Sequence, residues 1–273
     1  MNRIDATFQT LKADGRVGLF PYLTAGFPAL DATERLVRVA VDAGADAIEL
    51  GVPFSDPLAD GTTMQRASEV ALSNGASLAW AIGLGARLRA TLSVPLILMT
   101  YYNPIHRYGI ERFASDAEGA GLDGFIVPDL PSAEAADLTR AAELRDLYLV
   151  QMVAPTTTPE RLAEVGRTAR GFVYCVSLLG TTGARTQLSI RLPDFIAQVR
   201  AHVSQPILIG FGIASPEHVA AVRGQAEAVV VGSAIADLLG NAAAGDREST
   251  LGAYIRSLRS AAEPERTATE TRL

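Results

Sequence analysis

The sequence has almost no cysteine and very little histidine. Its 273 residues include one cysteine, Cys175, so no disulfide can form within the chain. A single thiol fits a reducing compartment, and we expect the protein in the cytoplasm. The three histidines, His106, His202 and His218, are scattered, and the last two fall in helical segments. This spacing argues against a metal site.

Long apolar runs and an excess of positive charge are also missing. The first fifteen residues carry charges throughout, so no secretory signal is predicted, and no uncharged stretch approaches the length of a membrane span. The net charge of −6 argues against a nucleic-acid binder, which normally has a basic face. We therefore expect neither a membrane nor a nucleic acid as a partner.

Short apolar segments are abundant and alternate with longer, alanine-rich segments of helical period. Several of them, such as PLILM and AVVV, are apolar almost without alternation, as parallel strands covered on both faces are. The predicted strands are Val17–Thr24, Ala47–Leu50, Pro95–Met99, Gly124–Val127, Tyr148–Val153, Phe172–Cys175, Pro206–Ile209 and Ala228–Val231.

Eight strand–helix units are compatible with a closed barrel or an open doubly wound sheet. We favour the barrel because the count matches closure, because no G-x-G-x-x-G follows the first strand, and because special residues follow many different strands. The sequence thus predicts an α/β fold, a single (β/α)8 TIM barrel over residues 1–273. Ile4–Asp14 is predicted as an extra helix before the first strand, a short phosphate-binding helix is predicted after the eighth, and the last dozen residues are expected to fray.

The segment IELGVPFSDPLADG, which follows the second predicted strand, contains the most informative polar residues. Glu49 lies inside an otherwise apolar strand, where an ionised carboxylate is costly to bury. Prolines stiffen the next eleven residues and the glycines Gly51 and Gly61 allow sharp turns, so Asp60 can fold back over the barrel mouth near Glu49. Two carboxylates in different environments suit acid–base catalysis. The alternative is a structural glutamate that a neighbouring strand satisfies.

Glycine turns follow the last two predicted strands. Gly210 and Gly212 lie just beyond the seventh strand, and Gly232 and Ser233 lie just beyond the eighth, before a short helix. Glycines let a phosphate approach backbone N–H groups, and a helix N-terminus adds its positive end. Ordinary turn glycines are the alternative, but two such turns in the last two units favour a phosphate site.

The loop after the sixth predicted strand, YCVSLLGTTGARTQLS, is long and rich in small residues. Glycine hinges at Gly180 and Gly183 are typical of a lid that excludes water, and we expect Gly180 and Thr182 to belong to it. A plain surface loop is the alternative. Elsewhere, Cys175 is expected to pack in its strand, whereas Asp129, Tyr101 and Asn103 are expected in the pocket or at an interface.

Taken together, these segments resemble the α subunit of tryptophan synthase over nearly the whole chain. The matching motifs are PYLTAGFP, IELGVPFSDPLADG, LMTYYNP, GFIVPDLP, SLLGTTGAR, GFGI and VVVGSAI, in that order. The glycine turns alone would fit other phosphate-binding barrels, so the loop after the second strand is the most specific of them. Two departures stand out: Thr62 follows ADG where proline is commoner, and Leu178-Leu179 precede GTTG where polar or small residues are commoner.

The resemblance implies a lyase that performs the retro-aldol cleavage of indole-3-glycerol phosphate to indole and D-glyceraldehyde 3-phosphate. It implies Glu49 as the proton donor and acceptor and Asp60 as the acceptor of the indole N–H hydrogen bond. By the same resemblance, the remaining residues contact the substrate. Those expected in the indole pocket are Tyr22, Met99, Tyr174 and Phe211, and those expected at the phosphate are Gly183, Gly212, Gly232 and Ser233.

The resemblance also implies a partner, a pyridoxal-phosphate-dependent β subunit that receives indole in an α2β2 heterotetramer for tryptophan biosynthesis. No cofactor is expected in this chain, and Pro53, Asp56 and Asp129 are expected at the docking face. Three other readings stay open: a stand-alone lyase that releases free indole, a catalytically idle regulatory subunit, and a sugar-phosphate isomerase on the same barrel.

Overall fold

Eight parallel strands form a closed barrel, as the sequence predicted. The structure, a computed structural model, describes residues 1–176, 192–210 and 212–264. Each strand pairs with the next one along the chain, and β8 pairs with β1. The strands are β1 Gly18–Thr24, β2 Ile48–Gly51, β3 Leu96–Met99, β4 Gly124–Ile126, β5 Tyr148–Val153, β6 Val173–Val176, β7 Ile207–Gly210 and β8 Ala228–Val231.

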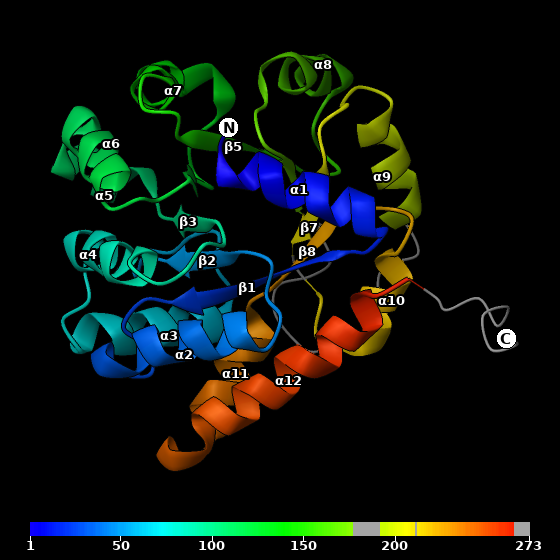
Figure 1. Ribbon diagram of the computed structural model, residues 1–273. Helices are drawn as coiled ribbons and strands as arrows, with labels where there is room; N and C mark the ends of the chain where they lie inside the picture. Colours follow the sequence, from blue (N-terminus) through cyan, green and yellow to red (C-terminus); the bar gives the residue numbers. More distant parts are fainter. Residues whose placement is uncertain (177–191, 211, 265–273) are drawn as a thin grey trace, which may run out of the picture.

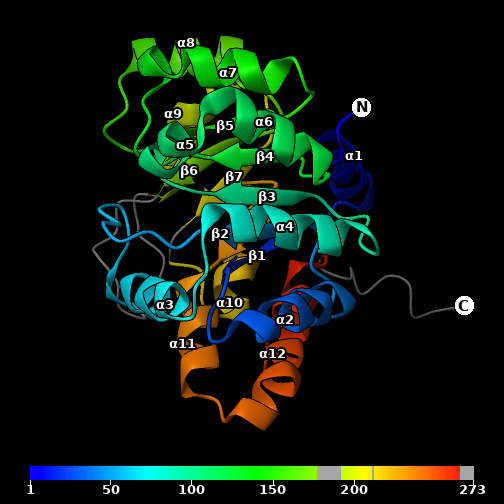
Figure 2. The same ribbon diagram turned by 90° about the vertical axis from the view of Figure 1, so that its left-hand side faces the viewer.

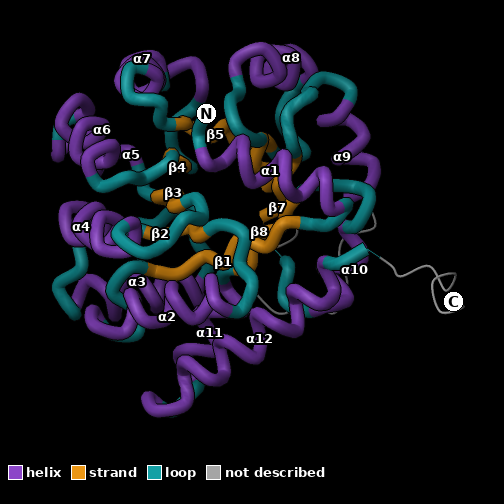
Figure 3. The backbone as a smooth tube through the Cα atoms, in the orientation of Figure 1, coloured by secondary structure: helices purple, strands orange, loops and turns teal. Residues whose placement is uncertain are grey.

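Helices form a ring outside the strands (Figure 3). The α-helices of the described residues are α1 Arg3–Asp14, α2 Leu30–Asp42, α3 Thr62–Ser73, α4 Leu78–Arg89, α5 Tyr102–Tyr108, α6 Ile110–Gly119, α7 Ala136–Glu143, α8 Pro159–Thr168, α9 Leu192–Arg200, α10 Pro216–Val222, α11 Ser233–Asn241 and α12 Arg247–Ala262. Two 3-10 turns, η1 Ser132–Glu134 and η2 Ala244–Asp246, precede α7 and α12. In the part of the chain that the structure describes, no helix combines the length and the apolar character that crossing a bilayer requires.

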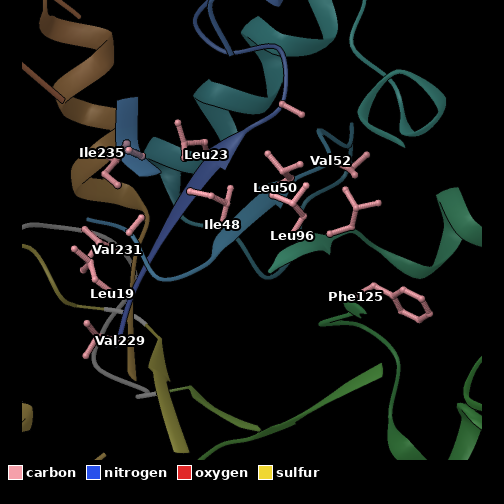
Figure 4. Close-up of a cluster of buried hydrophobic side chains, with 14 of the residues drawn as sticks. Leu19, Leu23, Ile48, Leu50, Val52, Leu96, Phe125, Val229, Val231 and Ile235 are labelled. Carbon is pink, nitrogen blue, oxygen red and sulfur yellow. The ribbon is translucent and has the colours of Figure 1, made fainter. Parts of the chain in front are cut away.

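The outer face of the barrel is buried under the helices, which explains why the strands are apolar on both faces. Leu23 on β1, Ile48 and Leu50 on β2 and Leu96 on β3 belong to one large cluster with the helix side chains (Figure 4). Each of these side chains is at most 2% exposed, and such burial stabilises the fold by about 1.5–3 kcal/mol per side chain. The helix ring therefore fixes the strands on which the site residues stand.

The inner face of the barrel has its own core, and α1 closes one end of it. Figure 1 shows α1 lying across the middle of the ring of strands. Phe8 of α1 contacts Phe20 and Phe172, with ring centroids 5.7 and 5.5 Å away. In Figure 2, α1 lies at the opposite end of the barrel from the loop between β2 and α3. The predicted helix before β1 is thus present, and it packs as a floor.

Asp123 ties the floor to the barrel wall. This buried carboxylate accepts hydrogen bonds from Arg3 of α1 at 2.9 Å, from Arg89 of α4 at 2.8 Å and from the Leu96 amide of β3 at 2.8 Å. Its partners come from three elements, so the charge is both paired and hydrogen-bonded, as a buried carboxylate must be.

The end of the chain carries the predicted short helix after β8. This helix is α11, and it is followed by α12, which packs against α10 and α2. Of the dozen residues expected to fray, Ala262 is buried at the end of α12, and residues 265–273 lie outside the described part of the chain.

Candidate active site

Glu49 lies within β2, and strand alternation directs its side chain into the barrel. Its neighbours Ile48 and Leu50 face the helices, whereas Ala47 belongs to the interior cluster. Glu49 is 1% exposed, and its Oε1 has no hydrogen-bond partner among the described residues. An unpaired buried carboxyl oxygen is costly in a purely structural role, so its position indicates a group kept for a ligand.

Burial controls the protonation of Glu49. Loss of solvation, and to a smaller extent the negative charge of Asp60, raises the pKa of Glu49 from 4.5 to about 8. At neutral pH the side chain is therefore mostly a neutral carboxylic acid that can donate a proton.

Asp60 lies at the end of the loop from β2 to α3, just before Gly61, the N-cap residue of α3. Burial raises the pKa of Asp60 from 3.8 to about 6, and a hydrogen bond from Tyr101 opposes that rise. The Tyr101 hydroxyl also accepts a hydrogen bond of 3.0 Å from the Ala59 amide, so one tyrosine holds the end of this loop. Asp60 is thus mainly ionised at neutral pH while Glu49 is not, which is the difference that acid–base chemistry needs.

Two tyrosines lie beside the carboxyl pair, and each occupies space that a glycine leaves open. Tyr22 pairs with Glu49 in the β1–β2 register, and a Cβ on Gly51 would lie 1.7 Å from the Tyr22 hydroxyl oxygen. A Cβ on Gly210 would lie 2.1 Å from Cε1 of Tyr174. Burial, together with the charges of Glu49 and Asp60, raises the pKa of both tyrosines. Both phenols therefore stay neutral.

The role of Gly210 differs from the one expected for it. Gly210 was expected just beyond the seventh strand, but it is the last residue of β7 and makes room for Tyr174. Neither this contact nor that of Gly51 with Tyr22 could be found from spacing alone, because each depends on the lateral fit of neighbouring strands.

The residues expected at the phosphate follow β7 and β8. Gly212 is exposed and adopts a φ of +83°, and no described atom other than those of its chain neighbours lies within 4 Å of the place where a Cβ would stand. Gly232 precedes α11 as its N-cap, no side chain caps this helix end, and Ser233 is its first residue. A helix N-terminus with uncapped N–H groups is an anion site. Gly232 also lies 3.4 Å from the Tyr22 Cβ, measured from its ideal Cβ position, so this end adjoins the tyrosines.

The other predicted pocket residues are only partly covered by the structure. Met99 ends β3, lies in the interior cluster and pairs with Gly51 across the β2–β3 register. Phe211, Gly180, Thr182 and Gly183, like the Leu178-Leu179 departure, lie outside the described residues. Thr62, the other departure, is the exposed first residue of α3.

The three residues expected at a docking face differ in exposure. Asp56 and Asp129 are exposed, and Asp129 accepts a 2.8 Å hydrogen bond from the Tyr102 amide, whereas Pro53 is buried. Leu58, which the sequence analysis did not single out, is 93% exposed in the same loop as Asp56. The exposure of Leu58 could not be predicted from the sequence, since the sequence does not show whether an apolar loop residue is covered.

Metal and thiol chemistry have no obvious place in the described residues. These residues include no group of three or more His, Cys, Asp or Glu side chains that could hold a metal ion. Cys175 is buried on β6 in the outer cluster, and burial raises the pKa of its thiol to about 12. Its expected packing role is consistent with that position.

Comparison with known proteins agrees with this geometry. The family model described as "Tryptophan synthase alpha chain" matches residues 8–263. The chain is 49% identical to the tryptophan synthase alpha chain of Chloroflexus aggregans, over 96% of this chain and 99% of that one. It is 43% identical to that of Geobacter sulfurreducens, over 96% and 99%.

Solved structures agree as well. The crystal structure of tryptophan synthase subunit alpha from Legionella pneumophila superposes with a TM-score of 0.89 at 38% identity, covering 96% of this chain and 98% of that one. A chain of Mycobacterium tuberculosis tryptophan synthase gives a TM-score of 0.89 at 35% identity, covering 96% and 99%. The similarity extends over the barrel and the segments that hold Glu49 and Asp60, and the chain belongs to the tryptophan synthase alpha chain family.

Proposed function

We propose that Glu49 and Asp60 carry out the alpha reaction of this family, the cleavage of indole-3-glycerol phosphate to indole and D-glyceraldehyde 3-phosphate. The observation that carries the proposal is the Glu49 carboxyl group, which is buried, unpaired at Oε1 and protonated at neutral pH beside an ionised Asp60. As a member of the family, the protein is a lyase of tryptophan biosynthesis.

Glu49 supplies the protons. Its carboxylic acid protonates C3 of the indole ring, which turns the ring into an electron sink. The bond between C3 and the glycerol chain then breaks, and its electron pair returns to the ring. The hydroxyl proton of the chain passes to the Glu49 carboxylate as the aldehyde forms, so Glu49 ends the cycle protonated. Each positioned proton transfer contributes about 10²–10⁴-fold to the rate.

Asp60 stabilises the intermediate of that step. Protonation at C3 places positive charge on the indole nitrogen, and a carboxylate that accepts the N–H hydrogen bond lowers the energy of this charge. Tyr101 holds Asp60 in place, as its contacts with Ala59 and Asp60 suggest. The apolar neighbours Tyr22, Met99 and Tyr174, with Phe211, would enclose the ring.

The phosphate would bind on the amide groups of Gly212, Gly232 and Ser233, together with Gly183. The uncapped N-terminus of α11 supports this placement because it offers N–H donors and the positive end of the helix dipole. We also propose that Gly180 and Thr182 belong to a lid, as the composition of that loop suggested.

A β subunit is the partner that family membership implies. We propose an α2β2 assembly in the cytoplasm, in which pyridoxal phosphate belongs to the partner, this chain holds no cofactor, and indole passes between the subunits. Asp56, Asp129 and Pro53 would lie at or under the docking face. The exposure of Leu58 supports this location, because an apolar side chain that is open to water in the free chain gains from being covered.

Indole release from indole-3-glycerol phosphate tests the proposal. The purified chain and its Glu49→Gln variant are assayed with and without a β subunit, and binding of indole propanol phosphate is measured in parallel. We expect slow cleavage that β accelerates and that the variant loses. Fast cleavage without β would identify a stand-alone lyase. Stimulation of β by an inactive chain, unchanged in the variant, would identify a regulatory subunit. Failure to bind indole propanol phosphate would favour a sugar-phosphate enzyme.

A further inference from the structure

The loop between β7 and α10 is held at one residue by two side chains from different helices. The Ala214 amide donates to Nδ1 of His218 on α10 at 3.2 Å, and the Tyr254 hydroxyl on α12 donates to the Ala214 carbonyl at 3.0 Å. Ile213, the preceding residue, is 3% exposed in the outer cluster. The backbone N–H and C=O groups of Ala214 are therefore both hydrogen-bonded to side chains.

Both side chains are set firmly in the molecule. His218 is 6% exposed, and α10 packs against α12, as Figure 1 also shows. Burial raises the pKa of Tyr254 to about 12, so its hydroxyl keeps the proton that it donates to Ala214. Because Nδ1 of His218 accepts a hydrogen bond, the ring proton must be on Nε2.

Gly212, by contrast, has open space around its Cβ position among the described residues. No described atom other than those of its chain neighbours lies within 4 Å of that position, the residue is exposed, and its φ of +83° lies in the left-handed region that favours glycine. Ile213 and Ala214, which follow Gly212 directly and are anchored, therefore restrict where Gly212 lies. Fixing a donor before the ligand arrives lowers the entropy lost on binding.

We infer that His218 and Tyr254 are positioning residues for the substrate phosphate. They hold Ala214 from two helices and thereby fix the Gly212 amide at the barrel mouth. The inference rests on the proposed function, since it requires the phosphate to bind at Gly212. A purely local role is the competing reading, because Ser215 caps α10 and accepts from the His218 amide at 3.4 Å. Such a role would affect stability alone.

The test measures KM and kcat for indole-3-glycerol phosphate and the inhibition constant of glycerol 3-phosphate. In His218→Leu and in Tyr254→Phe we expect KM and the inhibition constant to rise about three- to tenfold, the range that corresponds to losing one hydrogen bond. The kcat value should stay within about twofold, since uniform binding is lost. His218→Asn should behave like the wild type, because its Oδ1 occupies the position of Nδ1 and can accept from the Ala214 amide.

Tyr148→Phe is the matched control. It removes a comparable hydroxyl hydrogen bond, to Asp5 at 2.6 Å, at the α1 end of the barrel. Thermal unfolding of all variants separates loss of stability from loss of affinity. If His218→Leu does not fold, Tyr254→Phe and His218→Asn still test the inference.

A Gly212→Ala variant separates this inference from the function on which it rests. If the wild type cleaves the substrate and Gly212→Ala weakens glycerol 3-phosphate, while His218→Leu and Tyr254→Phe leave the inhibition constant unchanged, the positioning role is overturned and the function stands. If Gly212→Ala has no effect, the phosphate binds elsewhere and the inference falls with that placement. Equal rises in KM for Tyr148→Phe, or no rescue by asparagine at position 218, would also overturn it.

Discussion

Glu49 has a measurable cost to the folded protein, because it is a carboxyl group buried without a partner for Oε1. Its folded pKa of about 8 lies above the ordinary value of 4.5, so the folded chain binds more protons than the unfolded chain between these two values. By linkage, the free energy of unfolding falls as the pH rises through this range.

Glu49→Gln removes that cost and should be more stable than the wild type at high pH. We expect no difference near pH 4 and a gain on the order of 5 kcal/mol at pH 9, where the wild-type carboxylate is ionised. Urea denaturation at both pH values checks this prediction. A gain that does not depend on pH would show that Glu49 has an ordinary pKa.

The carboxyl pair also predicts a bell-shaped pH profile of kcat/KM. Ionisation of Asp60 gives the acid limb near pH 6, and ionisation of Glu49 gives the alkaline limb near pH 8. In Asp60→Asn the residual activity should lack the acid limb. Its alkaline limb should also move to lower pH, because the negative charge of Asp60 is one cause of the raised pKa of Glu49. An alkaline limb that stays in place would contradict the coupling.

Substitution of Gly51 or Gly210 should lower activity by displacing a tyrosine from the site. A Cβ at Gly51 would overlap the side chain of Tyr22, and a Cβ at Gly210 would overlap that of Tyr174. In each case the tyrosine ring would have to move. Gly51→Ala should lower kcat/KM at least ~10-fold with a stability loss of ~1–3 kcal/mol. Gly83→Ala, in the middle of α4 with its nearest atom 3.8 Å away, is the control and should change neither quantity for the worse. Steady-state kinetics and denaturation measure both.

At the scale of single residues, the sequence could identify Glu49 because a carboxylate inside an apolar strand stands out. It could also place Asp60 near the mouth, since the proline-rich loop limits where the chain can go. The hold of Tyr101 on Asp60 and the fit of Tyr174 over Gly210 could not be predicted, because both depend on which side chains meet across strands.

At the scale of elements, Asp123 is the point where α1, α4 and β3 meet. Asp123→Ala leaves the guanidinium of Arg89, 14% exposed, without its carboxylate and the Leu96 amide without its acceptor. We expect a loss of ~3–5 kcal/mol in the free energy of unfolding. The KM of the surviving folded enzyme should stay within about twofold, because the network lies at the end of the barrel away from Glu49. A large change in KM would show that the floor and the mouth are coupled.

The elements were the most predictable part of the molecule. All eight predicted strands are present, each within one residue of its predicted ends, because strands buried on both faces are continuous apolar runs. The helix before β1 was predicted by its pattern, but its position as a floor was not, since nothing in a sequence fixes where an added helix packs.

At the scale of the whole molecule, the docking face can be tested apart from the chemistry. Asp56→Ala and Asp129→Ala should lower the stimulation by a β subunit about threefold to tenfold while the cleavage rate of the isolated chain stays the same. Ser132→Ala, in the η1 turn close to Asp129, is the control and should leave both rates unchanged. Stimulation that survives both aspartate variants would place the face elsewhere.

The aromatic floor of the barrel limits how substrate enters and how product leaves. Phe8, Phe20 and Phe172 pack together at the α1 end of the barrel, so the interior is closed at this end and open only at the other. Substrate and product must therefore use the same open end, and a second substrate molecule cannot enter until the product has left. A protein bound over the open end of the barrel therefore controls the product, because it either blocks release or provides the path along which the product leaves.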